Sequence, residues 1–402
     1  MTTYTKKTDC ICCGSTDLKE VINLNDQPLA NSYHDNNSEL DIYPLRLNLC
    51  KNCYHLQLSH IVNPDLMFKD YLYVSGTTKT LCDYFDWFAY FVTSKNKVGN
   101  VLDIACNDGS QLNSFKRLGW QTYGVDPAEN LYGISSENHN VVCDYFLGRN
   151  QFSTKFDVVT AQNVFAHNEN ALKFLNDCSD VLDDDGTLYI QTSQSEIVNS
   201  NQFDTIYHEH ISFFNINSMN ELSKRSKLHL VDVIKTPVHG ISYVFVFKKT
   251  TTDVEKRWVD NLIDVEKERG LCKLTTYDYY ADNIRKIRTN FNEQIDKHKS
   301  DGYTIIGYGA AAKGMTFLNF AGCDQIDTII DDNPLKQGLY TPGSNIQINS
   351  IEYVRDLPTD AKVLFVPLAW NFYNEIRDRI KRVRYNTNDV FLKYFPSVIT
   401  EG

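Results

Sequence analysis

The chain has 402 residues, more than one hydrophobic core usually supports, so two or three domains are expected. Its net charge is −11 and it has no basic run, which makes nucleic acid and anionic membranes poor candidate partners. No segment approaches the ~18 consecutive apolar residues of a membrane span, and residues 1–7 are polar rather than signal-like. We therefore expect a cytoplasmic protein, in the host cytoplasm if the source is viral.

The first region, residues 1–75, carries two Cys-x-x-Cys pairs, Cys10 with Cys13 and Cys50 with Cys53. Two such pairs bring four thiolates to one tetrahedral zinc ion. Cys12 does not fit the Cys-x-x-Cys spacing of its neighbours and is not expected to be a ligand. Four cysteine ligands leave no open position for a substrate, so we predict a structural zinc that lets a region with a small core fold.

The second region, residues 76–250, alternates apolar runs with helical stretches. This alternation predicts an α/β domain with a mainly parallel sheet covered by helices. The expected strands are 100–105, 121–126, 156–161, 187–191 and 243–248.

The first of these strands runs through Asp103 into a tight turn that ends at Gly109, where a helix begins. Such a turn brings the backbone close to a cofactor, and Asp126, at the end of the next strand, can bind both hydroxyls of a ribose. A dinucleotide site would need G-x-G-x-x-G, which is missing. The turn instead resembles the [DE]-x-G-C-x-x-G motif of class I methyltransferases, with Ala105 in place of the first glycine. The residues predicted to bind S-adenosylmethionine are Asp103, Ala105, Asn107, Gly109, Asp126, Asp144 (at the adenine amino group) and Asn163.

The segment 207–210, Tyr-His-Glu-His, is the densest cluster of reactive side chains. In a strand, alternation would place the tyrosine and the glutamate on one face and the two histidines on the other. A metal site, an acid–base site and coincidence are all open, but metal is disfavoured because no third ligand lies nearby. Acid–base chemistry is favoured because histidine titrates near neutral pH. His167 follows the fourth strand and would open toward the same crevice.

Residues 251–300 form two charged helical segments, which we interpret as a connector with caps near Thr252 and 276–278. Residues 301–402 are a second, smaller α/β unit, with strands expected at 303–308, 326–330 and 362–367. The small-residue turn before Lys313 suits a phosphate at a helix start, or is an ordinary helix start in a packing domain.

Taken in their order along the chain, these motifs resemble those of the sugar C-methyltransferases of deoxysugar biosynthesis, typified by the C-3 methyltransferase of tetronitrose formation. The resemblance covers nearly the whole length. Beyond the cysteine pairs and the 103–109 turn, it is carried by Leu-Ala-Asn at 29–31, Asp-Tyr-Leu-Tyr-Val-Ser-Gly-Thr at 70–77, Phe-Asp-Thr-Ile-Tyr-His-Glu-His at 203–210, Pro-Val-His-Gly at 237–240, Gly-Tyr-Gly-Ala-Ala-Ala-Lys at 307–313 and Asp-Asp-Asn-Pro at 331–334.

This resemblance implies a zinc-knuckle N-terminal domain, a central class I methyltransferase domain with a Rossmann-like fold, and a C-terminal Rossmann-like domain. The implied substrate is a nucleotide-linked 4-keto-6-deoxy sugar, methylated at C-3 through an enolate. His210 is the expected base, Tyr207 and Glu209 orient it or the sugar, and His167 stabilises the enolate oxygen. Candidates for the substrate side are Tyr73, Ser75, Thr77, His239, Tyr308, Lys313 and Asn319. A monomer or a weak homodimer is expected.

Two departures from the family pattern stand out. The family often continues His-Gly with a second glycine and a later arginine, whereas this chain has Ile-Ser-Tyr-Val at 241–244. The missing arginine suggests a different sugar or nucleotide, and Ala105 is the second departure. Two other functions stay open: an O- or N-methyltransferase of similar sugars, and a catalytically silent sugar-nucleotide-binding protein.

Overall fold

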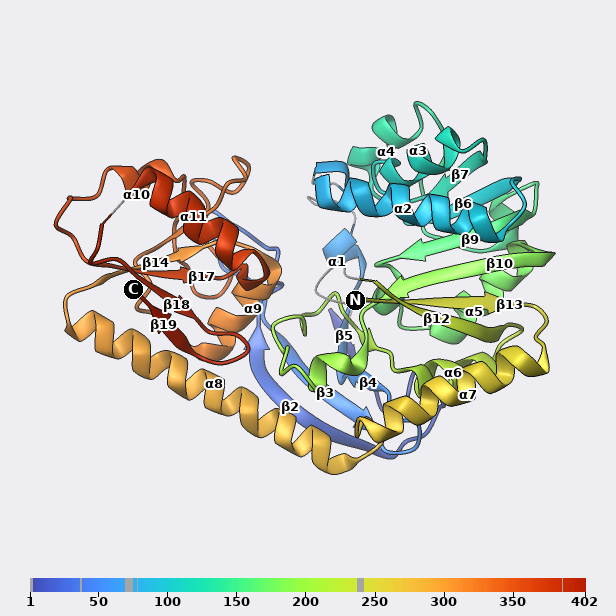
Figure 1. Cartoon of the computed structure of the whole chain (residues 1–402), viewed down its shortest axis with the longest axis horizontal. Helices are drawn as coiled ribbons and strands as arrows, with labels where there is room; N and C mark the ends of the chain where they lie inside the picture. The colour runs from blue at the N-terminus through green and yellow to red at the C-terminus, as the bar shows by residue number, and fades with distance from the viewer. Residues whose placement is uncertain (1–2, 37, 69–74, 78, 237–241, 385) are drawn as a thin grey trace.

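The computed structural model describes residues 3–36, 38–68, 75–77, 79–236, 242–384 and 386–402. Two α/β lobes stand on either side of an N-terminal β-sheet, and the long helix Leu274–Ser300 runs beneath the sheet and the C-terminal lobe (Figure 1). The predicted α/β class is therefore confirmed. Within the described residues, no helix combines the length and apolar character needed to cross a membrane.

The N-terminal region is mostly β-structure. Its four-stranded sheet has the order β11-β4-β3-β2, and a separate pair joins β1 to β5. The strands are β1 (Tyr4–Lys6), β2 (Leu18–Gln27), β3 (Tyr43–Cys50), β4 (Leu56–Leu58), β5 (His60–Val62) and β11 (Ser212–Phe213). The edge strand β11 comes from far along the chain and pairs with β4, so the N-terminal sheet is completed by the central region.

The core of this sheet is larger than expected. Alternate residues of β3, including Leu45 and Leu47, are fully buried, as a strand with one covered face requires. They belong to the same hydrophobic cluster as Phe317 and Ile329 of the C-terminal lobe. The prediction of a small core was wrong, because the apolar face of the sheet is covered by another domain.

The central lobe is built on a seven-stranded sheet with the order β12-β13-β10-β9-β6-β7-β8. All strands are parallel except β13, which runs antiparallel to both of its neighbours. The strands are β6 (Asn100–Ile104), β7 (Gln121–Val125), β8 (Asn140–Val142), β9 (Phe156–Gln162), β10 (Leu182–Thr192), β12 (His229–Thr236) and β13 (Ser242–Lys248). The five expected strands are present, and β8 and β12 add to them. The strand order reverses between β6 and β9, and ligands bind at such a switch point in open α/β sheets.

Helices cover both faces of this sheet. One face packs against α2 and α3, and the other against α5, α6 and α7. The helices of this region are α1 (Asp65–Phe68), α2 (Lys79–Lys95), α3 (Ser110–Arg117), α4 (Glu129–Ser135), α5 (Ala171–Val181), α6 (Ile216–Arg225) and α7 (Asp253–Glu268), with 3₁₀ turns η1 (Ser75–Thr77), η2 (Arg149–Gln151), η3 (Phe165–His167) and η4 (Ser195–Val198).

The C-terminal lobe repeats this architecture on a smaller scale. Its sheet has the order β16-β15-β14-β17-β18-β19 and is parallel except for β19. The elements are β14 (Thr304–Tyr308), α9 (Ala312–Ala321), β15 (Thr328–Ile330), β16 (Ile348–Asn349), α10 (Glu352–Arg355), β17 (Val363–Pro367), η6 (Trp370–Phe372), α11 (Tyr373–Val383), β18 (Val390–Lys393) and β19 (Ile399–Glu401). Its strand order reverses between β14 and β17.

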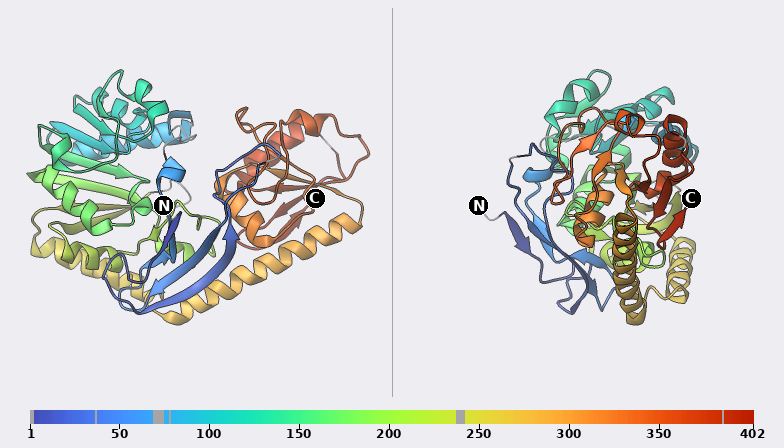
Figure 2. Two further views of the ribbon diagram at one scale, coloured as in Figure 1. Left: turned by 180° about the vertical axis from the view of Figure 1, so that it is seen from behind. Right: turned by 90° about the vertical axis from the view of Figure 1, so that its left-hand side faces the viewer.

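The two charged helical segments are α7 and α8 (Leu274–Ser300). Thr252 caps α7 in a capping box with Glu255, as predicted. The predicted cap at 276–278 was wrong: α8 begins one turn earlier, and the Thr276 hydroxyl donates to the Gly270 carbonyl. The helix α7 packs on the central lobe, whereas α8 lies along the N-terminal sheet and the C-terminal lobe (Figure 2).

Candidate functional site

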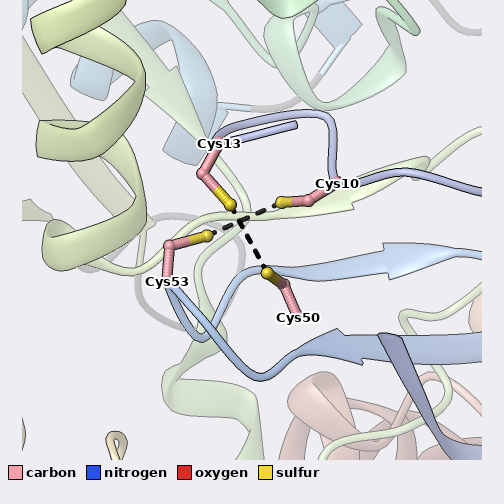
Figure 3. Close-up of side chains that lie close together, drawn as sticks. All are labelled: Cys10, Cys13, Cys50 and Cys53. Carbon is pink, nitrogen blue, oxygen red and sulfur yellow. Dashed lines mark hydrogen bonds between the residues drawn. The ribbon is translucent and has the colours of Figure 1, made fainter. Parts of the chain in front are cut away.

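The four paired cysteines form the predicted metal centre. Their sulfur atoms lie within 4.8 Å of one another, and all four side chains point toward one centre (Figure 3). The Sγ distances are 3.6 Å for Cys10–Cys53 and 3.5 Å for Cys13–Cys50. A tetrahedral zinc site with Zn–S bonds of about 2.3 Å needs ~3.8 Å between sulfurs, whereas a disulfide needs about 2.05 Å. The geometry therefore fits a zinc ion.

The zinc knuckles are held by side chains that follow the Tyr-His-Glu-His segment (207–210) in sequence. Asn217 Nδ2 donates to the Cys53 carbonyl at 3.0 Å, and Asn215 Nδ2 donates to the Tyr54 carbonyl at 2.7 Å. Arg225, at the end of α6, donates to the Cys12 carbonyl of the other knuckle. The metal centre and the start of α6 therefore form one structural unit.

The turn after β6 has the backbone that a close cofactor contact requires. Ala105, Asn107 and Gly109 all have positive φ, of 61°, 51° and 80°. A Cβ at Gly109 would lie 3.0 Å from a ring carbon of His139, so a side chain does not fit there. Ala105 adopts the left-handed region at a cost of about 1 kcal/mol. The substitution of the family's first glycine therefore preserves the shape of the turn.

Two carboxylates hold this turn. Asp126 Oδ2 accepts from the Asn107 amide at 2.8 Å, and Asp126 Oδ1 accepts from the Ala128 amide at 2.9 Å. Burial raises the pKa of Asp126, and these two amides oppose the shift. Asp103 is buried behind the turn, where it accepts from Gln111 and Thr160, and burial raises its pKa to about 7. Asp103 therefore supports the turn from within the fold.

The other predicted cofactor residues lie at the same edge of the sheet. Asn163 follows β9 with a positive φ of 53°. Asp144 follows β8 and is exposed, and its carboxylate accepts from the Tyr145 amide. Ser75, predicted on the substrate side, instead donates its amide to Asn107 Oδ1 at 2.9 Å. The η1 turn therefore packs directly on the cofactor turn.

The Tyr-His-Glu-His segment is a turn rather than a strand. The prediction that alternation would separate the tyrosine from the second histidine was therefore wrong. The ring centroids of Tyr207 and His210 are 4.2 Å apart, and the Tyr207 hydroxyl lies 3.2 Å from His210 Nε2. A turn brings residues i and i+3 together, which a strand cannot do.

The tautomer of His210 follows from its partners. His210 Nδ1 lies 2.8 Å from the Thr205 carbonyl, which can only accept a hydrogen bond. Nδ1 therefore carries the proton, and in the neutral ring Nε2 carries the lone pair. That nitrogen is the one next to Tyr207, so this side of the ring is the basic side.

Glu209 and His208 point away from His210. Asn31 Nδ2 donates to Glu209 Oε1 at 2.6 Å, and burial raises the pKa of Glu209 to about 7. His208 Nε2 donates to the Tyr43 carbonyl at 3.3 Å, and burial lowers its pKa to about 4. Glu209 was predicted to orient His210 or the sugar. Its hydrogen bond to Asn31 of the N-terminal region does not favour the first alternative, and the second stays a prediction.

His167 lies beside His210, with ring centroids 5.2 Å apart, and it stacks on Phe68 at 5.4 Å. Its Nε2 atom is buried and has no hydrogen-bond partner among the described residues. Burial lowers the pKa of His167 to about 4, so the ring is neutral at physiological pH. A neutral imidazole with an unused nitrogen is suited to bind a polar substrate atom.

The C-terminal substrate candidates do not converge. Tyr308 is buried, and its hydroxyl donates to Asp332 at 3.0 Å. Asn319 donates to the Pro342 carbonyl at 3.1 Å, and Lys313 lies 5.7 Å from the centroid of the Trp370 ring. Tyr73, His239 and the side chain of Thr77 lie outside the described residues.

The turn before Lys313 already holds a protein carboxylate. Asp331 Oδ2 accepts from the Ala310 amide at 2.7 Å. A phosphate bound at this helix start would lie beside the Asp331 carboxylate. Because the two negative charges would repel each other, this geometry does not favour a phosphate site.

The sequence reasoning missed several polar groups. Gln191 and Thr192, at the end of β10, are buried, and the Gln191 amide and Thr192 hydroxyl have no partner among the described residues. The sequence does contain a signal for Gln191 and Thr192, since two adjacent polar residues end an otherwise apolar strand. Asp204 and Trp370, which hydrogen-bond each other at 2.5 Å, gave no local signal because they are 166 residues apart.

Three family models match consecutive parts of the chain. The model described as "Putative zinc binding domain" matches residues 10–68, and the model described as "Methyltransferase domain" matches residues 77–233. The model described as "C-methyltransferase C-terminal domain" matches residues 237–396.

Two relatives were found among characterised proteins. The chain is 30% identical to C-methyltransferase NovU of Streptomyces niveus over 394 residues, which cover 94% of this chain and 93% of NovU. It is 29% identical over 104 residues to the ubiquinone biosynthesis O-methyltransferase of Glaesserella parasuis, covering 23% of this chain and 44% of that protein. Among solved structures, the CcbJ methyltransferase of Streptomyces caelestis matches with a TM-score of 0.35 and 12% identity, covering 42% of this chain and 90% of CcbJ.

The near full-length match to a C-methyltransferase agrees with the order of the three family models along the chain. The Asp126 turn fits S-adenosylmethionine as the methyl donor, and the four-cysteine cluster fits zinc as a structural metal. This chain therefore belongs to the family of S-adenosylmethionine-dependent C-methyltransferases that carry an N-terminal zinc-binding domain.

Proposed function

We propose that this enzyme methylates C-3 of a nucleotide-linked 4-keto-6-deoxy sugar. The sugar substrate rests on the resemblance to the C-methyltransferases of deoxysugar biosynthesis. The observation that carries the chemistry is that Tyr207 and His167 both lie next to His210, with His167 after the carboxyl end of β9, the strand beside β6. A base next to a neutral hydrogen-bonding histidine suits the removal of a proton adjacent to a ketone.

His210 is the base in this proposal. A sugar carbon becomes nucleophilic only when the C-3 proton is removed and the electron pair moves to the ketone oxygen, which gives an enolate. The Nε2 lone pair of His210 accepts that proton, because the Thr205 carbonyl holds the other ring nitrogen as N–H. The Tyr207 hydroxyl donates to Nε2 in this structure and holds the imidazole, and it must turn away from the lone pair when the C-3 hydrogen of the sugar approaches.

His167 stabilises the enolate oxygen. The low pKa of this buried ring keeps it neutral, so it donates a hydrogen bond without carrying a charge into the site. S-adenosylmethionine, when bound, supplies an electrophilic methyl group on a sulfonium, held by Asp126, the 105–109 turn and Asp144. Gln191 and Thr192 are further candidates for contacts with a ligand, because burying them without partners costs free energy.

Asp126→Ala is expected to weaken binding of S-adenosylmethionine about 10- to 100-fold, because a buried carboxylate and two backbone hydrogen bonds are lost. Isothermal titration calorimetry measures the dissociation constant directly. Asp157→Ala is the matched control, since its carboxylate also accepts from a backbone amide, that of Asn100, but at the opposite end of the sheet. Equal dissociation constants for the two variants would show that Asp126 does not bind the donor.

The proposed substrate is tested with a panel of 4-keto-6-deoxy sugars linked to dTDP, GDP, UDP or CDP. Incubation with S-adenosylmethionine is expected to add 14 daltons to at least one of them, with the methyl group on C-3 by NMR. In D₂O without the methyl donor, the same sugar is expected to exchange its C-3 hydrogen. A methyl group on oxygen or nitrogen, or no exchange, would contradict the carbon-methylation mechanism.

A further inference from the structure

A buried carboxylate joins the catalytic segment to the C-terminal lobe. Asp204 lies six residues before His210 and is 1% exposed. Its Oδ2 atom accepts from Trp370 Nε1 at 2.5 Å and, at the longer distance of 3.5 Å, from the Tyr394 hydroxyl, while Oδ1 has no partner among the described residues. Burial raises the pKa of Asp204, and the nearby charge of Lys313 and the Trp370 N–H oppose this shift. Burying a carboxylate costs free energy unless hydrogen bonds or an opposite charge compensate for the lost water.

The partners of Asp204 lie at the switch point of the C-terminal sheet. Trp370 follows β17, Lys313 is in the first turn of α9 after β14, and the strand order reverses between these two strands. In open α/β sheets, a ligand binds in this crevice. Here it receives protein side chains instead: Asp204 from the central lobe, and Tyr33, whose hydroxyl donates to the Ala310 carbonyl at 2.5 Å.

Asp204 is directly coupled to the base through the backbone. The next residue, Thr205, provides the carbonyl that accepts from His210 Nδ1 at 2.8 Å. The Thr205 carbonyl belongs to the 205–206 peptide, one residue after Asp204, so a shift of the backbone at Asp204 would move this carbonyl relative to the ring. Asp204 therefore lies one residue before the group that accepts the Nδ1 proton of His210.

We propose that Asp204 is a positioning residue, through which Trp370 of the C-terminal lobe holds the Thr205 carbonyl and hence the reactive tautomer of His210. This inference rests on the proposed role of His210 as the base. In this proposal the C-terminal lobe contributes to catalysis by orienting the segment 204–210. The contact lies at the crevice in which other open α/β sheets bind a ligand.

The test is Trp370→Phe, which removes the indole N–H but keeps a ring to pack on Phe395, at 4.4 Å in the wild type. Trp120→Phe is the matched control, because its N–H donates to Thr93 in the central core at 2.9 Å. Nitrogen-15 NMR of labelled histidines reports the tautomer, with the His210 signals assigned by their loss in His210→Gln. Trp370→Phe is expected to lose the pure Nδ1–H tautomer, and the control is expected to keep it.

Kinetics and a second pair of variants complete the test. Trp370→Phe is expected to lower kcat about 10-fold and to shift the acidic limb of the pH–rate profile, where the base loses its proton, with the KM for S-adenosylmethionine unchanged. Asp204→Asn keeps an oxygen that accepts from Trp370, so it is expected to retain the wild-type tautomer, whereas Asp204→Ala is expected to lose it.

The outcomes separate the two proposals. An unchanged His210 tautomer in both Trp370→Phe and Asp204→Ala would overturn the positioning role, whatever His210 does. A changed tautomer with a wild-type methylation rate would support the positioning contact and contradict the role of His210 as the base.

Discussion

Cys53→Ser is expected to release zinc and to abolish methyl transfer by unfolding the N-terminal sheet. Four-cysteine zinc sites in small domains contribute an apparent ~10 kcal/mol or more at neutral pH, which is comparable to the whole stability of a domain. The loss of structure is expected to extend beyond the N-terminal sheet. Asn217, in the first turn of α6, donates to the Cys53 carbonyl, and β11, which precedes α6, pairs with β4 of the sheet. The turn at 207–210, for which we propose a catalytic role, immediately precedes β11 and is therefore expected to lose its support.

Zinc content by inductively coupled plasma mass spectrometry and thermal unfolding by circular dichroism check this result. Cys12→Ala is the matched control, because Cys12 is fully buried in the same knuckle but is not one of the four clustered cysteines. It is expected to retain one zinc per chain and to stay active. If Cys53→Ser kept its zinc and its melting temperature, the four-cysteine assignment would be wrong.

His210→Asn is expected to lower kcat by about 10² to 10⁴, the range in which a general base acts, while the affinity for S-adenosylmethionine stays unchanged. The reason is that asparagine can still accept or donate hydrogen bonds at this position but cannot take a proton at neutral pH. Exchange of the sugar C-3 hydrogen with D₂O, followed by NMR, measures the proton-removal step separately from methyl transfer.

The neighbouring His208 offers a control for this experiment. His208 is buried and bonded to the Tyr43 carbonyl on the N-terminal sheet, so His208→Gln keeps a donor there and leaves the His210 ring in place. It is expected to exchange the C-3 hydrogen at the wild-type rate. Wild-type exchange by His210→Asn would instead show that another group removes the proton.

Much of the fold was predictable because it depends on local patterns. The apolar runs at 100–105 and 156–161 became β6 and β9, and the capping box at Thr252 began α7 where expected. The Cys-x-x-Cys spacing predicted the metal centre, since a knuckle is a turn of a few residues and needs little from the rest of the chain.

The segment 203–210 shows where local patterns fail to predict the structure. Alternating residue types at 207–210 suggested a strand, but a strand needs a partner with backbone groups to pair, and these residues form a turn instead. The partner of Glu209 is Asn31, and the partner of Asp204 is Trp370, each more than 160 residues away along the chain. No periodicity within the segment carries information about either contact.

The sequence by itself determined the four clustered cysteines and the methyltransferase sheet, because short-range spacing and strand patterns encode them. Only the tertiary structure decided which nitrogen of His210 is basic, that Glu209 faces the N-terminal domain, and that the C-terminal lobe reaches Asp204. These features depend on hydrogen bonds between distant segments, and their geometry exists only after the lobes have packed against the shared N-terminal sheet.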